Sequence, residues 1–157
     1  MSSKPEVATD PRRKVETKTI DPRGPRFGAW ITTVVLAVVL VTGWWPLLAL
    51  QAVVFALGTF LGLGRAPYGL VYRYLVLPRI GPTSEREEEA PPRFAQGVGL
   101  FFAVVGVIGY ASGLTVLGIV ATGLALVAAL LNAAVGLCLG CEVYLLLRRA
   151  GIPAFGG

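Results

Sequence analysis

Residues 27–64 read FGAWITTVVLAVVLVTGWWPLLALQAVVFALGTFLGLG, 38 positions without a charged side chain. A second run, residues 94–141, is free of charge over 48 positions. A helix needs about 20 apolar residues to cross the hydrocarbon core of a bilayer. Each run is therefore long enough for two spans joined by a tight turn. The sequence predicts an all-α membrane protein with four transmembrane helices, and hence the lipid bilayer as its first partner.

Residues that end helices mark the two turns. Gly43-Trp44-Trp45-Pro46 interrupts the first run, and a Trp pair suits a membrane–water interface. Tyr110-Ala111-Ser112-Gly113 interrupts the second run. We therefore expect spans at about residues 27–43, 47–64, 94–111 and 114–133.

The overall composition excludes several classes of protein. Hydrophobic residues make up 55% of the 157 residues and charged residues only 15%, against about 25% charged residues in soluble domains. The absence of histidine excludes His-based catalytic triads and most zinc enzyme sites. Two cysteines are too few for a disulfide-rich secreted scaffold.

The basic residues predict the topology. They fall before the first run, between the two runs and after the second: Lys4, Arg12, Arg13, Lys14, Lys18, Arg23 and Arg26; Arg65, Arg73, Arg79, Arg86 and Arg93; Arg148 and Arg149. Four spans place all of them on one side, and an excess of Lys and Arg marks the cytoplasmic side. We expect a multi-pass protein of the inner (plasma) membrane with both termini cytoplasmic and no nucleic-acid partner. A five-span alternative, splitting residues 114–147, would leave Arg148 and Arg149 outside.

The polar segments read as connections and tails. Residues 1–24 are polar, basic and contain proline, which is typical of a disordered cytosolic tail. Residues 81–92 predict a solvated acidic linker, with a docking patch for a basic partner as the alternative. Residues 150–157 form a short tail.

An internal repeat organises the chain. Pro25-Arg26-Phe27 opens the first run and Pro92-Arg93-Phe94 opens the second. Each triplet precedes two expected spans and a tyrosine-containing segment that ends in basic residues. We interpret residues 25–80 and 93–149 as two parallel repeated hairpins. Each is followed by a cytoplasmic-side amphipathic or broken helical segment, at residues 67–78 and in a Cys-bearing helix at 136–149.

The segment Gly136-Leu-Cys138-Leu-Gly-Cys141-Glu142 carries the candidate site residues Cys138, Cys141 and Glu142. Positions three apart share a helix face, so the two thiols can approach each other. Glu142 is the only charged residue between Arg93 and Arg148, and an ionisable group at a membrane segment favours a functional role. Two thiols and one carboxylate fall short of the four ligands of a zinc site, so we expect no metal or cofactor. Inert packing of the cysteines is the alternative.

Helix geometry predicts how far apart Cys138 and Cys141 lie. On one helix the Cα atoms should lie about 5–6 Å apart, within disulfide range, but their Cβ atoms should point apart. We therefore expect free thiols at rest and a disulfide that forms reversibly. Glu142 would raise the pKa of a neighbouring thiol unless an arginine such as Arg73 neutralises it. Two lone amides, Gln51 and Asn132, predict hydrogen bonds between helices.

Four segments carry a family resemblance: Asp21-Pro-Arg-Gly-Pro-Arg-Phe27, Gln51-Ala-Val-Val-Phe55, Pro92-Arg-Phe-Ala-Gln96 and Asn132 through Glu142. They resemble an uncharacterised family of small integral membrane proteins, frequent in actinobacteria. The resemblance covers roughly residues 20–149, and its most specific part is Asn-Ala-x-x-Gly-x-Cys-x-Gly-Cys-Glu at 132–142. Members are often encoded near thioredoxin-like or rhodanese-like proteins. The resemblance implies a link to thiol or sulfur metabolism and carries over no catalytic assignment.

Three functions follow as hypotheses. The first is a membrane dithiol that exchanges disulfides or relays sulfur with a soluble thioredoxin-like or rhodanese-like protein. The second is a structural or accessory subunit of a homo-oligomer or a larger membrane complex, as the glycine-rich helices allow. The third is a small transporter of a sulfur species. Whether the protein is an enzyme stays open at this point.

Overall fold

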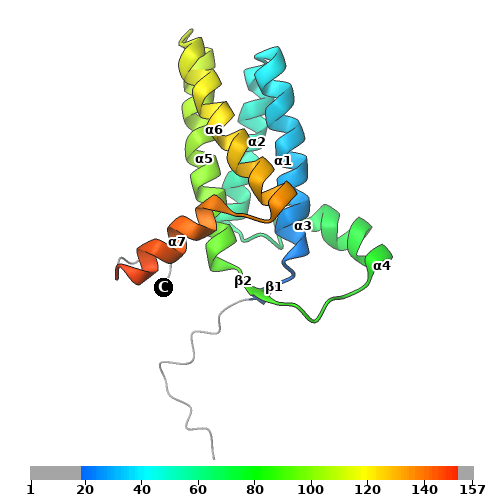
Figure 1. Ribbon diagram of the computed structural model, residues 1–157. Coiled ribbons are helices and arrows are strands. Elements are labelled where there is room, and N and C mark those ends of the chain that lie inside the picture. The colour runs from blue at the N-terminus through cyan, green and yellow to red at the C-terminus, as the bar shows by residue number, and fades with distance from the viewer. Residues whose placement is uncertain (1–18, 152–157) are drawn as a thin grey trace, which may run out of the picture.

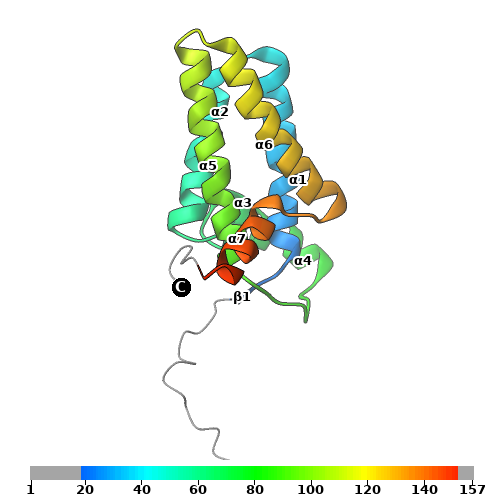
Figure 2. The ribbon, with the colours of Figure 1, turned by 60° about the vertical axis from the view of Figure 1, so that its left-hand side comes forward.

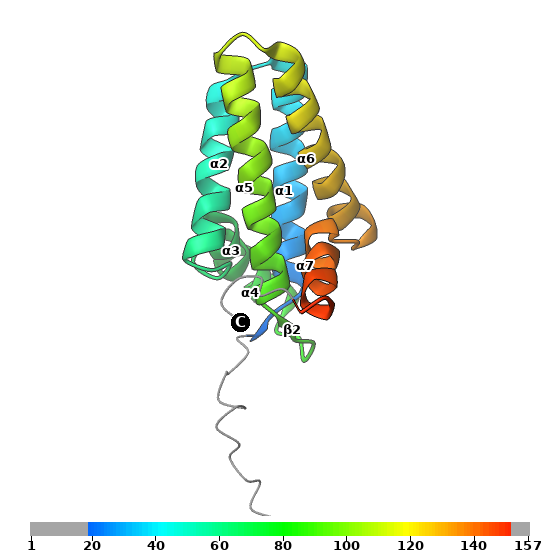
Figure 3. The same ribbon diagram turned by 90° about the vertical axis from the view of Figure 1, so that its left-hand side faces the viewer.

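The computed structural model describes residues 19–151, and four long apolar helices form its body (Figure 1). They run alternately up and down the bundle, joined by short turns at its upper end in Figure 3. The first turn has Gly43 with a φ of 67° and the second has Gly113 with a φ of 85°, where only glycine fits readily. The helices are α1 (Arg23–Thr42), α2 (Trp45–Phe60), α5 (Ala90–Ala111) and α6 (Thr115–Val135).

Three of these helices, α1, α5 and α6, are long and apolar enough to cross a membrane. Helix α2 is also apolar but has 16 residues, because it ends at Phe60 and not at the expected residue 64. Large aliphatic side chains cover the outside of the bundle, among them Val41, Val116 and Val135. The arrangement is consistent with a membrane protein, as the composition predicts.

The interior is built where helices from the two halves of the chain meet. Helix α1 packs mainly against α6, and α2 packs mainly against α5. The fully buried side chains include Leu36, Val39 and Leu48, and Ala103 lies among them. Helices α5 and α6 cross where a Cβ added to Gly109 would lie 2.5 Å from the backbone nitrogen of Gly118. This close approach is the tight packing that glycine-rich helices predict.

Shorter elements gather at the lower end of the bundle in Figure 1. A continuous helical segment consists of α3 (Pro67–Val71), the π-helix η2 (Tyr72–Val76) and α4 (Leu77–Ile80). Helix α7 (Leu139–Arg149) lies at the same end. With 11 residues, or about 16 Å at 1.5 Å per residue, α7 is too short to cross a bilayer, which removes the basis of the five-span alternative.

Two expectations for the polar segments were wrong within the described residues. Residues 19–24 are ordered: β1 (Thr19–Ile20) pairs antiparallel with β2 (Glu87–Glu88), and α1 begins at Arg23. The acidic linker is also partly structured. Glu89 is buried and accepts a hydrogen bond from the Leu63 N–H at 2.9 Å. The glutamates therefore make contacts within the chain that tie it together. The rest of the expected N-terminal tail, residues 1–18, and residues 152–157 lie outside the described part.

Two arginines close the lower ends of helices that belong to the other half of the chain. Arg26 Nε donates to the Ala133 carbonyl at 3.0 Å, at the end of α6. The guanidinium of Arg93 donates to the Thr59 and Phe60 carbonyls at 2.5 and 2.9 Å, at the end of α2. The last carbonyls of a helix have no partner within it, and a cation there also opposes the helix dipole.

We predict that Arg93→Met destabilises the protein by about 1–3 kcal/mol, because two carbonyls lose a charged donor. Thermal unfolding in detergent would measure this change. Arg79→Met is the matched control, since within the described residues the Arg79 side chain donates no hydrogen bond to a carbonyl of another helix, as Arg93 does. Equal melting temperatures for the two variants would contradict the assignment.

Buried polar groups also join the helices to one another. The Gln51 amide donates to Thr32 Oγ1 at 3.4 Å, and its carbonyl oxygen accepts a hydrogen bond from Tyr68. This confirms the expected interhelical role of Gln51. Nearby, the Tyr72 hydroxyl donates to Asp21 Oδ2 at 2.8 Å, and Arg23 forms an ion pair with the same carboxylate at 3.1 Å.

These contacts shift the pKa values of Asp21 and Tyr72. Burial opposes ionisation of Asp21, but the hydrogen bonds from Arg23 and Tyr72 outweigh it, so the pKa of Asp21 lies below its usual value. Burial first, and the bond to the Asp21 carboxylate second, raise the pKa of Tyr72 to about 12. Neutral Tyr72 therefore stabilises the fold fully below pH about 10, and this contribution is lost as pH rises through about 12. The Asp21 contribution is lost only in acid.

We predict that Tyr72→Phe removes one late-titrating tyrosine from the alkaline titration curve of the folded protein. Tyrosinate absorbance against pH would show it, with Tyr74→Phe as the control because Tyr74 is exposed. The same variant should also make stability less sensitive to pH between about 10 and 12. If Tyr72→Phe and Tyr74→Phe remove the same part of the titration curve, the Asp21 contact is ruled out.

Candidate functional site

The turn after α6 sets the position of the first cysteine. Helix α6 ends at Gly136, whose left-handed φ of 77° reverses the chain, and the Leu137 N–H bonds back to the Leu131 carbonyl at 3.2 Å. This pattern closes helices that end in glycine. Two residues later Cys138 has an extended backbone, with φ −88° and ψ 103°, and is the N-cap of α7. Cys138 therefore precedes the helix that carries Cys141.

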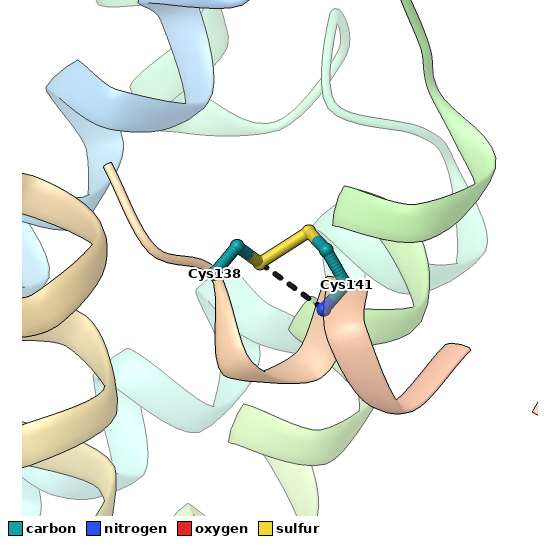
Figure 4. The surroundings of a disulfide bond; sticks show 2 residues. All are labelled: Cys138 and Cys141. Atoms are coloured by element: carbon teal, nitrogen blue, oxygen red, sulfur yellow. Dashed lines mark hydrogen bonds between the residues drawn. A yellow bond between two sulfur atoms is a disulfide. The ribbon is translucent and has the colours of Figure 1, made fainter. Parts of the chain in front are cut away.

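The two cysteines form a disulfide, shown in Figure 4. Their Cα atoms are 5.1 Å apart, within the predicted range. The expectation of free thiols was wrong for this structure. It placed both residues on one regular helix, whereas the extended N-cap conformation of Cys138 turns its side chain toward the first helical turn. There the Cys138 Sγ also accepts a hydrogen bond from the Cys141 N–H at 3.2 Å.

An N-cap cysteine has a defined chemical character. The first N–H groups of a helix lack internal partners and carry a partial positive charge. A sulfur at this position faces those N–H groups, which favours the thiolate form once the disulfide is reduced. Both cysteines are half-buried. Cys138 is thus the cysteine whose sulfur lies at the N-terminus of α7.

Three contacts hold α7 against the start of α5 and the strand β2 that precedes it. The rings of Tyr144 and Phe94 lie 5.7 Å apart between centroids. Arg148 forms an ion pair with Glu88 at 3.1 Å. Between the cysteines, a Cβ added to Gly140 would lie 2.5 Å from the Cβ of Ala95. The dipeptide that separates the cysteines is therefore pressed onto α5, and only glycine fits at its second position.

Glu142 does not have the expected arginine partner. It stands in the first turn of α7, where a carboxylate suits the helix N-terminus, and it is exposed. In the described chain its carboxylate makes no ion pair. Arg73, the proposed partner, lies on η2 with its guanidinium 5.9 Å from the ring centre of Tyr74. Glu142 thus belongs to the same helix turn as the disulfide without being bonded to it.

The disulfide borders a cavity of about 560 Å³. Residues of α1, α2, α5 and α6 line the cavity, together with the cysteines at the start of α7 and Glu85 and Glu87 before α5. Figure 2 shows α7 beside the lower part of α5. Apolar side chains form most of its wall: Phe55, Val98, Phe102, Leu124, Ala128 and Ala129. Charged residues, Arg23, Arg26, Glu85 and Glu87, line its polar end. Ligand sites in proteins commonly have volumes of about 300–1,000 Å³.

Two amides in the cavity wall are unpaired. Asn132 in the last turn of α6 and Gln96 near the start of α5 line the cavity and are partly buried. Within residues 19–151 neither side chain has a hydrogen-bond partner. The expected interhelical bond of Asn132 is therefore absent from the described structure. The cavity joins Gln96 to the cysteines although 42 residues separate Gln96 from Cys138, so local sequence patterns could not indicate it, whereas Asn132 stands in the same motif as the cysteines.

The comparisons place the chain in a family. The family model described as "Domain of unknown function (DUF4395)" matches residues 20–149, and the chain belongs to this family. The match has the extent that the sequence resemblance indicated. No curated protein and no solved structure matches the chain.

We predict that Gly140→Ala moves α7 away from α5, because the added methyl would overlap Ala95. After reduction, the cysteines should react faster with a maleimide, and the melting temperature should fall. Gly123→Ala is the matched control: it lies in α6 with nothing within 4 Å of an added Cβ and should stabilise its helix by about 0.5–1 kcal/mol. If Gly140→Ala is labelled no faster than Gly123→Ala, the contact between Gly140 and Ala95 is contradicted.

Proposed function

We propose that this protein is a membrane-embedded thiol–disulfide exchange protein in which Cys138 is the residue that reacts with the partner. The observation that carries the proposal is the position of Cys138 as the N-cap of α7, in a disulfide with Cys141. Exchange needs a sulfur that is both accessible and stable as a thiolate. A half-buried N-cap sulfur next to the N–H of Cys141 meets both needs.

The proposal includes a four-span topology. Helix α2 would cross the membrane beside α1, α5 and α6. The arginines of the described chain belong to elements at the end of the bundle that carries α7 (Figure 1). The positive-inside rule assigns that end to the cytoplasm. The exposed Trp44 and Trp45 are then at the opposite interface, where tryptophan is enriched.

The two hairpins would be parallel repeats, and matching contacts support this. Arg26 bonds the end of α6, and Arg93 bonds the end of α2, so equivalent arginines bond equivalent helices of the other hairpin. The rings of Phe27 and Tyr72 lie 5.8 Å apart, as those of Phe94 and Tyr144 lie 5.7 Å apart. In this reading α7 corresponds to the segment of α3, η2 and α4, and only the second copy carries cysteines.

The exchange reaction can be written completely. A thiolate of the partner attacks the Cys138 sulfur, the bond between Cys138 and Cys141 breaks, and Cys141 leaves as a thiolate that takes up a proton. The second thiol of the partner then attacks the mixed disulfide and releases Cys138. The partner becomes a disulfide and this protein a dithiol. Disulfides that occur in a reducing cytoplasm are usually transient and catalytic.

The partner we propose is a soluble cytosolic protein of the thioredoxin-like or rhodanese-like class. Such a protein presents a reactive cysteine on its surface and can reach a cysteine pair at the cytoplasmic end of a membrane bundle. The exposed Glu142, one residue after Cys141, would contact the partner. With a rhodanese-like partner, the thiolate of reduced Cys138 would attack the outer sulfur of the partner's persulfide. Cys138 would then carry that sulfur as its own persulfide, and the partner's cysteine would leave as a thiolate.

We predict that Cys141→Ser accumulates a mixed disulfide between Cys138 and its partner. The Cys138 thiolate can still attack the disulfide of an oxidised partner, the reverse of the second step above, and Cys141, which would complete that reverse reaction, is gone. Affinity purification of the variant from cells after acid quenching, followed by non-reducing electrophoresis and mass spectrometry, would identify the adduct. Cys138→Ser is the matched control and should trap much less. If Cys141→Ser yields no thioredoxin-like or rhodanese-like adduct, or if Cys138→Ser traps as well, the proposed mechanism is wrong.

A further inference from the structure

We propose that the cavity beside the disulfide binds a lipid-soluble quinone, which reoxidises the Cys138–Cys141 dithiol. This inference rests on the proposed exchange function, because it supplies the second half of a catalytic cycle. Each exchange with a reduced partner leaves two electrons on the cysteine pair. In a reducing cytoplasm the pair needs an oxidant to react again, and the bilayer is a source of two-electron oxidants in the form of quinones.

The first argument is the location of the cavity. Cys138 and Cys141 both line it, so a molecule inside it lies next to the sulfur atoms. Its wall continues from α7 to Phe102 on α5 and Leu124 on α6, residues of helices that are apolar enough to lie in a bilayer. A ligand that reaches this site from the lipid would meet the disulfide at the membrane surface.

The second argument is the chemistry of the wall. A quinone head group is a flat apolar ring with two carbonyl oxygens, each of which accepts a hydrogen bond. Phe55 and Phe102 provide aromatic surface, and the unpaired amides of Asn132 and Gln96 provide donors. Apolar walls with a few placed polar groups are typical of small-molecule sites. The volume of about 560 Å³ also fits a ring of this size with the first part of its tail.

The reaction balances without another reagent. One sulfur of the dithiol forms a bond with the other, and the two S–H bonds break. Two electrons and two protons pass to the quinone, whose carbonyls become the hydroxyls of a quinol. The disulfide is restored and the quinol leaves to the membrane. Electrons thus flow from the cytosolic partner through Cys138 and Cys141 to the quinone pool.

The experiment uses the full-length protein in detergent micelles, reduced with a phosphine that is then removed, and kept free of oxygen. Decylubiquinone is added, and its absorbance and the number of free thiols are followed together. The proposal expects one quinone reduced for every two thiols lost. Cys138→Ser should show neither change. Thiols that stay reduced in the presence of decylubiquinone and a naphthoquinone such as menadione would overturn the proposal.

Matched variants test the cavity itself. Ala128→Phe fills it, whereas Val127→Phe, one residue away, is a change on the exposed face of α6. Ala128→Phe should slow quinone reduction at least about tenfold, and Val127→Phe should leave it unchanged. Asn132→Leu should raise the quinone concentration that gives the half-maximal rate. Equal rates for the two phenylalanine variants would show that quinone reacts elsewhere, with lipid filling the cavity, and would overturn the assignment.

A separate measurement distinguishes the two proposals. The rate at which the oxidised protein exchanges with reduced thioredoxin as a probe should be the same for Ala128→Phe and the wild type. Normal exchange without quinone reduction overturns the quinone site and leaves the proposed function intact. Loss of exchange in the wild-type protein itself overturns both.

Discussion

The structure depends on the hydrogen bonds that the last backbone carbonyls of α2 and α6 accept. A helix that stops in an apolar environment leaves carbonyl oxygens without partners, and each unpaired group is costly. Here the missing donors come from Arg26 and Arg93, which stand at the first turns of the neighbouring hairpin's helices. The same two bonds therefore complete the helix ends and join the two halves of the chain. The end of α6 that Arg26 holds is also the point from which the chain turns toward Cys138.

The turn at Gly136 after α6 determines where the two cysteines lie. Gly136 ends α6, Cys138 is extended, and α7 begins at Leu139. Without the left-handed glycine the chain could not leave α6 at this angle. The fit of Gly140 on Ala95 then fixes α7 against α5. The cysteine pair is thus positioned by two glycines with different tasks, one that allows a backbone conformation and one that allows a close approach.

Much of the fold could be predicted from the sequence, because charge-free runs and helix-ending residues are local signals. The turns at Gly43 and Gly113 lie where those signals placed them, and the four apolar helices overlap the expected spans, although α1 and α5 begin earlier and α2 ends earlier than expected. The ordered contacts of Asp21 and Glu89 could not be predicted, since their partners are far away in the chain. For the site, the pair of cysteines and its spacing were visible, but the N-cap position of Cys138 was not. The Cys-bearing helix was expected to start at residue 136 but starts at Leu139, and this three-residue difference leaves Cys138 outside the helix and lets the two sulfurs meet.

Helix α2 has a consequence for the surrounding lipid. Its 16 residues span about 24 Å at 1.5 Å per residue, whereas a typical hydrocarbon core is about 30 Å thick. If it crosses beside its longer neighbours, the bilayer has to become thinner on that side of the bundle only, at a modest energetic cost per ångström. Such a one-sided deformation attracts other proteins that fit a thin membrane. It would concentrate the protein in thinner regions of the bilayer and orient its neighbours around α2.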